Sequence, residues 1–286
     1  MILVTGARGN LGSAVLSDLR EKGIPARGGS RTAGDGVRPM DFDDPGTLDL
    51  GGVSTLVLVS AGEAEDDVVI RRHGAVLDAA KRDDVVNVVY TSLTGSGDHL
   101  AFALAHRATE RMVRDSGMAW TILRNGLYAE LFGALLMWND IGLESAFGSG
   151  SLAAVARADL AAAAAEVAES PAAHAGRVYE LVGPPVTADQ VAERLGVAHG
   201  SISMGDYRDR LLRATGLLPF QPSMLTSIAT SIRHGFLDGA SPDLENLLGR
   251  AARDPAAVAS ATAIALRPAV SAQARRRTRT CSSDPG

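Results

Sequence analysis

Three glycines near the amino-terminus have the spacing of a phosphate-binding turn. Gly6, Gly9 and Gly12 follow a short apolar run, MILVT, and open a segment of helical periodicity, SAVLSDLREKG. The first glycine allows a sharp bend, the second lets the backbone approach a pyrophosphate, and the third lets the helix pack closely on the strand. Backbone N–H groups at Asn10 and Leu11 would then face the phosphates. The pattern predicts a dinucleotide-binding turn, and the alternative is a glycine-rich turn without a ligand.

Arginines, and no acidic residue, follow the second predicted strand in ARGGSRT (26–32). Dinucleotide-binding domains that use NAD keep an acid here for the ribose 2′-hydroxyl, whereas an arginine can bind the 2′-phosphate of NADP. Arg27 and Arg31 stand in this stretch, and Arg8 lies inside the glycine turn. We therefore expect NADPH in preference to NADH. The alternative is that these arginines are solvated surface residues.

Polar side chains follow the carboxyl ends of several predicted strands, the edge at which open parallel sheets bind ligands. After the third strand, Asp41 and Phe42 are placed to contact the adenine. At the nicotinamide end we expect the residues that follow the next three strands: Ser60, Ala61, Thr91, Ser92, Asn125, Gly126 and Tyr128. Asn125 can hold the nicotinamide carboxamide or donate to a substrate carbonyl. Tyr128 can stack on a flat acceptor or close the pocket, unless it only packs between two lobes.

Two histidines and a glutamate fall in predicted helices beside these strands. His106 can orient a substrate carbonyl or relay a proton. It stands four residues before Glu110 on the same helix face, so the alternative is a structural His–Glu pair on a solvated surface. His73 lies in the preceding helix, and we favour a position away from the cofactor. The six histidines are scattered and form no zinc-binding pattern, so no metal site is predicted.

Charge and composition exclude several classes of protein. The chain of 286 residues is 46% hydrophobic with a net charge of −5, and residues 267–286 hold five Arg and one Asp. The rest of the chain is therefore still more acidic, which argues against nucleic-acid binding. The single cysteine, Cys281, allows no disulfide framework, and no apolar run is long enough to span a membrane. We expect a soluble, cytoplasmic protein with a small-molecule substrate, and a homodimer is one option for its assembly.

Apolar strand patterns alternate with helical patterns over the first 125 residues. Predicted strands cover 1–5, 24–31, 38–42, 54–62, 85–92 and 118–125, with helices at 13–23, 64–82 and 100–116. This order predicts an α/β, Rossmann-type doubly wound parallel sheet, with an NAD(P)-binding domain over residues 1–125. A smaller, mostly helical substrate-binding lobe is expected over 126–266, with residues about 150–183 able to return to the first domain. Residues 267–286 are expected to be a disordered tail.

Helical patterns dominate the second half of the chain. Predicted helices cover 127–138, 157–170, 187–196, 204–216 and 222–237, and a strand covers 177–183. The helix over 187–196 has the clearest ends, because Thr187 and Gln190 form a capping box and Gly196 stops it. No internal repeat is evident. The second half of the chain is therefore expected to be mostly helical.

Five stretches resemble the NmrA-like group of atypical short-chain dehydrogenases. They are MILVTGARGNLG (1–12), VVYTSL (88–93), AHRATERMVRDSG (105–117), WTILRNGLYAELF (120–132) and ARADLAAAAAEV (156–167). Within this group the chain is similar to the quinone oxidoreductase 2 and triphenylmethane reductase types, from residue 1 to about 266. The resemblance implies a Rossmann domain with a small substrate lobe, NADPH as cofactor, and quinones or related electron-poor conjugated compounds as substrates.

Short-chain reductases usually keep a Tyr and, four residues on, a Lys where this chain and the group it resembles show His106 and Glu110. A ketone that accepts hydride becomes an alkoxide and needs a general acid. A quinone becomes a hydroquinone anion, which can take its proton from water. We therefore expect an NADPH-dependent oxidoreductase that transfers hydride directly to a small quinone or similar conjugated acceptor. The alternatives are a non-catalytic NADP(H) sensor and a reductase of a secondary-metabolite pathway.

Overall fold

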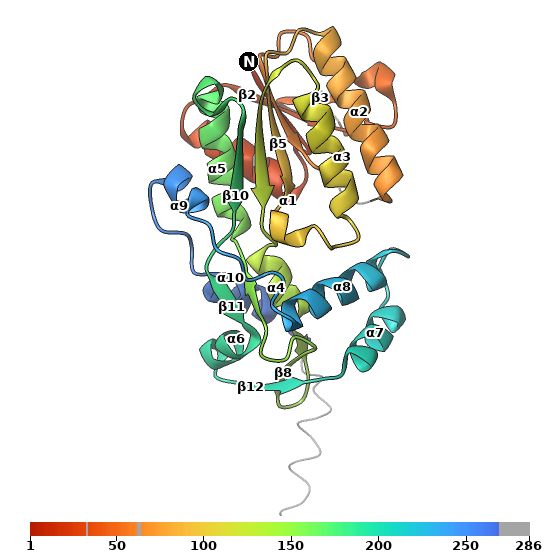
Figure 1. The fold of residues 1–286 in the computed structure, drawn as a ribbon, viewed down its shortest axis with the longest axis vertical. Helices are drawn as coiled ribbons and strands as arrows, with labels where there is room; N and C mark the ends of the chain where they lie inside the picture. Colours follow the sequence, from red (N-terminus) through yellow and green to blue (C-terminus); the bar gives the residue numbers. More distant parts are fainter. Residues whose placement is uncertain (33, 62–63, 269–286) are drawn as a thin grey trace, which may run out of the picture.

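Seven parallel strands form the central sheet of the main domain (Figure 1). The computed structural model describes residues 1–32, 34–61 and 64–268. The strands lie in the order β10-β6-β5-β4-β1-β2-β3. Their bounds are β1 (Ile2–Thr5), β2 (Ala26–Ser30), β3 (Val37–Pro39), β4 (Thr55–Val59), β5 (Asn87–Leu93), β6 (Ala119–Asn125) and β10 (Arg177–Leu181). The central strands are apolar and buried on both faces, as a parallel sheet covered by helices requires.

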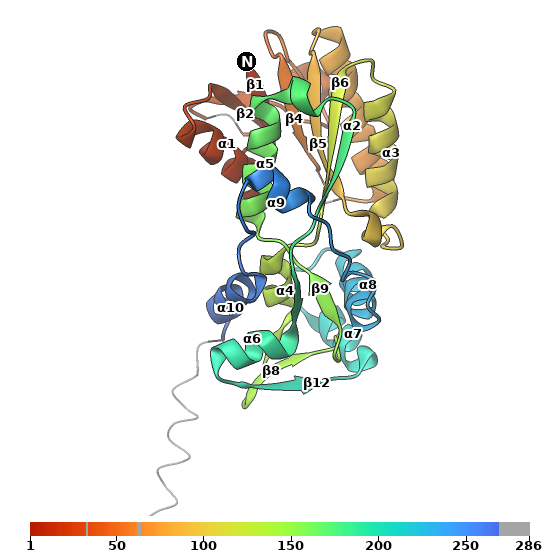
Figure 2. The same cartoon turned by 60° about the vertical axis from the view of Figure 1, so that its left-hand side comes forward.

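Helices cover both faces of this sheet (Figure 2). On one face lie α1 (Asn10–Glu21) and α5 (Arg157–Glu169), and on the other α2 (Asp66–Arg82) and α3 (Ala103–Arg114). Successive strand residues point to opposite faces, so Val57 packs with side chains of α1 and α5 while Leu56 packs with those of α2 and α3. The predicted Rossmann-type doubly wound fold is confirmed.

The chain crosses between the main domain and a smaller lobe several times. It enters the lobe after β6, at α4 (Ala129–Leu135), and returns with α5 and β10. β10 then pairs with β6 in parallel register, from Arg177 opposite Thr121 to Leu181 opposite Asn125. The short helix α9 (Asp243–Leu248) also comes back to pack beside α5. These crossings hold the lobe against the carboxyl ends of the strands (Figure 1).

The smaller lobe has its own apolar core, in which the rings of Phe132 and Phe147 stack 5.2 Å apart. Besides α4 it contains α6 (Ala188–Leu195), α7 (Met204–Arg213), α8 (Gln221–Arg233) and α10 (Pro255–Ala265). One small sheet joins β7 (Met137–Trp138), β8 (Gly142–Ser145) and β12 (Ala198–Ser201), and another joins β9 (Ser151–Ala153) to β11 (Pro185–Thr187). The lobe is thus mostly helical, as predicted.

The capping box of α6 is present, with Gln190 N–H donating to Thr187 Oγ1 and Gly196 in the left-handed conformation. The five short strands of the lobe and α10 were not predicted. Of the predicted tail, the Arg267 guanidinium lies over the Trp138 ring at 4.5 Å, and residues 269–286 lie outside the described residues. Within the described ranges, no helix is long and apolar enough to cross a membrane.

Candidate active site

The glycine turn has the geometry of a phosphate cradle. Gly6 has a φ of +62°, which side chains rarely adopt, and its carbonyl accepts the Gly9 N–H at 2.8 Å. A Cβ on Gly12 would collide with the Gly6 carbonyl, and one on Gly9 would lie 3.2 Å from the same oxygen. The N-cap of α1 is Gly9, which has no side chain to cap the first N–H groups of the helix. These N–H groups are therefore available to an anion.

Two of the three expected arginines lie near this turn. Arg31 directly follows β2 at the carboxyl edge and is exposed, and Arg8 reaches the same loop, where its Nε donates to the Thr32 carbonyl at 3.3 Å. Arg27 does not join them. It is the second residue of β2, opposite Leu3, and so lies toward the amino end of the strand. The expected cationic site is therefore reduced to Arg8 and Arg31.

The loop after β3 is fixed to α2 by ion pairs. Asp41 is half-buried, and its Oδ1 accepts the Asp43 N–H at 3.0 Å. The Asp43 carboxylate in turn binds Arg72 at 2.6 Å and Arg71 at 3.1 Å. Hydrogen bonds from these guanidinium groups outweigh desolvation and lower the pKa of Asp43 to about 2. Phe42, also half-buried, follows in the same loop, so both predicted adenine contacts lie on a held segment at the carboxyl edge.

A cavity of about 400 Å³ lies where the carboxyl ends of β4, β5 and β6 meet the lobe. The main domain contributes residues of the glycine turn and of the strand ends: Leu11, Val59, Ser60, Thr91, Ser92, Asn125, Gly126 and Tyr128. The lobe contributes Leu131, Phe220, Ser223, Met224 and Ile228. This volume is within the range of small-molecule sites. The cavity therefore joins most of the residues predicted for the nicotinamide end.

Asn125 has a buried oxygen without a partner at this cavity. The residue is 6% exposed, and among the described residues its Oδ1 has no hydrogen-bond partner. Leaving a buried amide oxygen unpaired costs free energy, so a hydrogen-bond donor brought to this atom by a ligand would be stabilising. A primary carboxamide, which has two N–H donors, is one group that would satisfy it.

Thr91 and Ser92, also predicted cofactor contacts, are engaged by the protein itself. Thr91 Oγ1 accepts the Ser60 N–H at 3.1 Å, which ties the ends of β4 and β5 together. Ser92 Oγ donates to Glu110 Oε1 at 2.7 Å. Both residues are buried and line the cavity. Their hydroxyl groups therefore help to fix the cavity wall.

The charged side chains of the described cavity lining are carboxylates. Glu65 and Asp66, at the start of α2, are the acidic residues there, and the other described lining residues are apolar, polar or histidine. A cation at this mouth would meet favourable potential, whereas an anion would be repelled. The cavity thus has a mainly apolar wall and a negatively charged rim.

The alternative interpretation of His106, a structural pair with Glu110, is wrong. The Nδ1 atom of His106 lies 3.0 Å from the hydroxyl of Tyr90, a fully buried residue of β5. Burial lowers the pKa of His106 to about 4, and the nearby Arg107 charge adds to this effect. His106 is therefore neutral near pH 7, half-buried, and part of the cavity lining.

Glu110 is buried at 1% exposure instead of lying on a solvated face. Its carboxylate accepts two hydrogen bonds from Arg124, at 2.9 and 2.8 Å, and one from Arg107 at 2.6 Å. A further bond comes from Arg114 at 3.1 Å. Burial raises the pKa of Glu110, but the hydrogen bonds from Arg124 and Ser92 and the charge of Arg107 outweigh it and lower the pKa to about 2. Glu110 is an anion at the centre of a buried ion network.

His73 is also buried, behind the strand ends. Its Nε2 accepts the Ala61 N–H at 3.0 Å, and its Nδ1 lies 2.8 Å from Thr109 Oγ1. Burial lowers the pKa of His73 to about 3, with smaller effects from His106 and Arg72. His73 is outside the cavity lining, so it supports the segment that follows β4.

Tyr128 both lines the cavity and packs between the two lobes. It precedes α4 as its N-cap and lines the cavity. Arg157 is the first residue of α5, and its guanidinium group lies 4.8 Å from the centre of the Tyr128 ring. Its ring therefore forms a fixed cavity wall where the two lobes meet, available for stacking on its cavity side.

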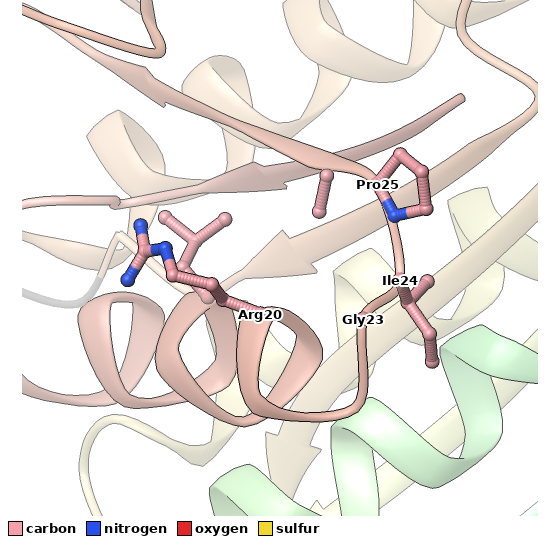
Figure 3. A pocket seen from close by; sticks show the side chains of 6 residues that line it. Arg20, Gly23, Ile24 and Pro25 are labelled. Atoms are coloured by element: carbon pink, nitrogen blue, oxygen red, sulfur yellow. The ribbon is translucent and has the colours of Figure 1, made fainter.

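A second pocket lies beside the amino end of β2, away from the carboxyl ends of the strands (Figure 3). It has a volume of about 320 Å³ and is formed by the end of α1 and the start of β2, with Arg20, Gly23, Ile24 and Pro25 in its wall. Helix α1 has 12 residues, which separates its end from the glycine turn by roughly 18 Å. This pocket is therefore not part of the candidate site. Among the described residues, no cluster of His, Cys, Asp or Glu could hold a metal ion.

The sequence analysis missed three parts of the site. Tyr90 and Arg124 were read only as strand residues, and α8 only as a helix. Tyr90 and Arg124 stand inside apolar strand runs, and a hydroxyl or guanidinium group in such a run is a weak signal of a buried polar partner. The place of α8 over the cavity depends on contacts distant in sequence, for which the sequence contains no local signal.

Comparisons with known proteins agree with this geometry. No family model matches the chain. Quinone oxidoreductase 2 of Escherichia coli is 35% identical over 275 residues, which cover 87% of this chain and 94% of that protein. An NmrA-like family domain-containing oxidoreductase of Aspergillus flavus is 35% identical over 155 residues, 48% of this chain and 50% of that protein.

Two solved structures of oxidoreductases superpose on nearly the whole chain. The Escherichia coli quinone oxidoreductase, complexed with NADPH, superposes with a TM-score of 0.80 at 33% identity, covering 91% of this chain and 99% of that chain. Triphenylmethane reductase of Citrobacter sp., complexed with NADP(H), gives a TM-score of 0.81 at 27% identity, covering 92% of this chain and 99% of that one. Because quinone oxidoreductase 2 is 35% identical and covered over 94% of its length, the chain belongs to the NmrA-like family of atypical short-chain dehydrogenases/reductases.

Proposed function

We propose that this oxidoreductase uses NADPH to reduce a small quinone or a similar flat, conjugated acceptor. The observation that carries the proposal is the cavity of about 400 Å³, which runs from the glycine turn at Leu11 to the lobe at Met224. It is adjacent to the place where the turn would hold a dinucleotide, and its wall is mainly apolar and aromatic. Relatives named for quinone reduction and for NADPH binding support the same activity.

The residues present fit an NADP-type dinucleotide. The Gly6–Gly12 turn supplies the N–H cradle for the pyrophosphate, and a Cβ at Gly12 would fill it. Arg31 and Arg8 lie at the end of β2, where they would bind the 2′-phosphate. The unpaired Oδ1 of Asn125 would accept from the nicotinamide carboxamide. When bound, the cofactor supplies the hydride.

The protein groups would then have three tasks. Leu11, Asn125 and Gly126 would hold the nicotinamide end of the cofactor. Tyr128, Phe220 and Met224, which also line the cavity, would hold a flat acceptor at near-attack distance, which supplies much of the rate enhancement. Apolar walls from Leu131 and Ile228 exclude water from the reacting carbons. The charge left on the reduced ring is delocalised, so the reaction needs no Tyr–Lys pair.

The second candidate is an NADP(H) sensor without turnover, and the cavity argues against it. A sensor needs the dinucleotide site only, whereas the lining of this cavity extends beyond the residues of the nicotinamide end to Leu131, Phe220 and Met224 of the lobe. Such a space suits an acceptor molecule. No observation in the described residues favours the sensor specifically.

The test follows NADPH absorbance with purified protein and a panel of neutral benzo- and naphthoquinones, with NADH as the comparison. We expect quinone-dependent oxidation of NADPH and slower oxidation of NADH. Binding of NADP(H) by calorimetry without turnover on any quinone would reject the reductase and leave the sensor.

A further inference from the structure

Tyr90 and His106 form a partly buried hydrogen-bonded pair at the wall of the cavity. The hydroxyl of Tyr90 lies 3.0 Å from His106 Nδ1, and the ring centres are 6.2 Å apart. Tyr90 is fully buried in β5, whereas the His106 ring also lines the cavity. Among the described lining residues, His106 is the only histidine. Its ring thus connects the sheet interior to the place of the acceptor.

The direction of this hydrogen bond follows from acid–base chemistry. Burial raises the pKa of Tyr90, so its hydroxyl keeps its proton, and burial keeps His106 neutral. A neutral imidazole nitrogen is a stronger base than a phenol oxygen, so the hydroxyl donates and Nδ1 accepts. The ring proton of His106 then resides on Nε2.

The Thr109 and Ser60 hydroxyl groups also interact with the Tyr90 hydroxyl, but an imidazole nitrogen is a better acceptor for the phenol proton than a hydroxyl oxygen. Because a backbone N–H can only donate, His73 Nε2 accepts from Ala61 and its ring proton sits on Nδ1. That proton goes to Thr109 Oγ1, whose own proton goes to the Ala105 carbonyl at 2.8 Å. His73 and His106 are therefore fixed as opposite tautomers on the two sides of Tyr90.

We propose that His106, held in its Nε2–H tautomer by Tyr90, donates a hydrogen bond from Nε2 to the carbonyl oxygen of the acceptor. This inference rests on the proposed function. Hydride addition gives the quinone two electrons and one hydrogen and leaves a hydroquinone monoanion. The Nε2–H group stabilises the oxygen on which that negative charge develops, and water supplies the remaining proton. Tyr90 is the positioning residue, because it acts only through His106.

His106 is a donor in this scheme and not a general acid. Loss of its Nε2 proton, with the Tyr90 proton following to Nδ1, would leave a tyrosinate in the sheet interior, where Tyr90 is fully buried. The groups around the imidazole are Tyr90 on β5, His73 on α2, and Arg107 and Glu110 on α3. With the pKa of His106 near 4, turnover should show no histidine ionisation between roughly pH 6 and 8.

The test compares two hydride acceptors, a p-benzoquinone and a triarylmethyl cation, which has no carbonyl oxygen. We expect His106→Leu to lower kcat/KM for the quinone by about 10²-fold, the usual effect of removing one oxyanion donor, with little change for the cation. His106→Gln keeps an N–H donor and should recover most of the quinone activity. Equal loss for both acceptors, or no loss, would overturn the inference.

A second measurement does not depend on turnover. Side-chain ¹⁵N NMR should show His106 as the Nε2–H tautomer in the wild type and as a mixture of tautomers in Tyr90→Phe. A wild-type Nδ1–H tautomer would overturn the assignment. The matched control is Tyr179→Phe, since Tyr179 pairs with His174 Nδ1 at 2.8 Å near the start of β10, away from the cavity. This control should alter the His174 signal and leave quinone reduction unchanged.

The two proposals fail in different ways. If the wild type reduces no quinone, the proposed function is rejected, while the NMR result still decides how Tyr90 and His106 are arranged. If the wild type reduces quinones and His106→Leu does so equally well, only the role of His106 is rejected.

Discussion

Arg27 lies near the amino end of β2, and Arg31, four positions later, directly follows the carboxyl end of this strand. Arg31 follows the last residue of β2 and is exposed beside the glycine turn, whereas Arg27 is opposite Leu3 near the strand's amino end. Only a cation at the carboxyl edge can reach a 2′-phosphate on a dinucleotide held by the turn. The two residues therefore form a natural test and control for cofactor choice.

We predict that Arg31→Ala weakens NADPH binding by about tenfold and leaves NADH binding unchanged, since a charge-assisted hydrogen bond contributes about 1.5–3 kcal/mol. Fluorescence titration of both cofactors measures this difference. Arg27→Ala should bind both cofactors as the wild type does. Equal weakening of NADPH and NADH by Arg31→Ala would mean that the residue supports the loop and does not select the phosphate.

The roles of residues that depend only on local backbone geometry could be predicted from the sequence. The glycine spacing and the capping residues Thr187 and Gln190 act within a few positions, so their patterns predicted the turn and the cap. The partner of His106 could not be found in this way. Spacing suggested Glu110, but Tyr90 enters from β5 beneath the helix, and burial in the sheet interface decides which group is reached.

The ion network around Glu110 joins four elements at the carboxyl edge. Glu110 on α3 binds Ser92 at the end of β5 and Arg124 on β6. Arg124 also binds Glu180 on β10 at 3.1 Å, and Glu180 accepts the Gly95 N–H at 2.9 Å after β5. The network therefore holds the strand ends that form the cavity wall.

We predict that Glu110→Gln lowers the free energy of unfolding by about 3 kcal/mol at pH 7, because the variant loses a carboxylate whose pKa is about 2 in the folded state and near the ordinary 4.5 when unfolded. A depressed folded pKa stabilises the protein above the unfolded pKa. That stability is lost as the pH falls from about 4.5 toward 2. Urea unfolding of the wild type and the variant across this range measures the difference, which should shrink toward the acid end.

The matched control for this prediction is Asp43→Asn. Asp43 also pairs with two arginines and has a lowered pKa, but it is exposed on the surface, where solvent screens the pair. We expect a much smaller change in the free energy of unfolding. A pH-independent loss in Glu110→Gln would show that packing around the amide, and not the charge, causes the destabilisation.

Elements were predictable where their pattern is strong and local. The central strands and the helices that cover the sheet have continuous apolar or 3.6-residue patterns, and their order along the chain was predicted. The short strands β7, β8, β9, β11 and β12 were not, because two to four residues show no periodicity and exist only through their partners. Close approaches such as the Gly142–Ala198 contact, where no Cβ would fit, set those pairings.

The division into two lobes assigns binding and selectivity to different parts of the molecule. The main domain supplies the glycine turn and the strand ends, and the lobe supplies the far wall of the cavity through α4 and α8. The position of α8 results from packing distant in sequence, with Ile228 and Ile232 in the lobe core. Changes on α8 should therefore affect the acceptor and leave the dinucleotide site intact.

We predict that Met224→Trp raises the KM for quinones severalfold, because the larger ring occupies part of a cavity of about 400 Å³, while the Kd for NADPH stays at the wild-type value. Steady-state kinetics with naphthoquinone and benzoquinone, together with NADPH titration, separate the two effects, and the bulkier naphthoquinone should suffer more. Leu212→Trp, on the exposed surface of α7 in the same lobe, is the control and should change neither constant. If Met224→Trp weakens NADPH binding and quinone turnover equally, α8 contributes to the cofactor site, and the separation of binding from selectivity between the lobes is wrong.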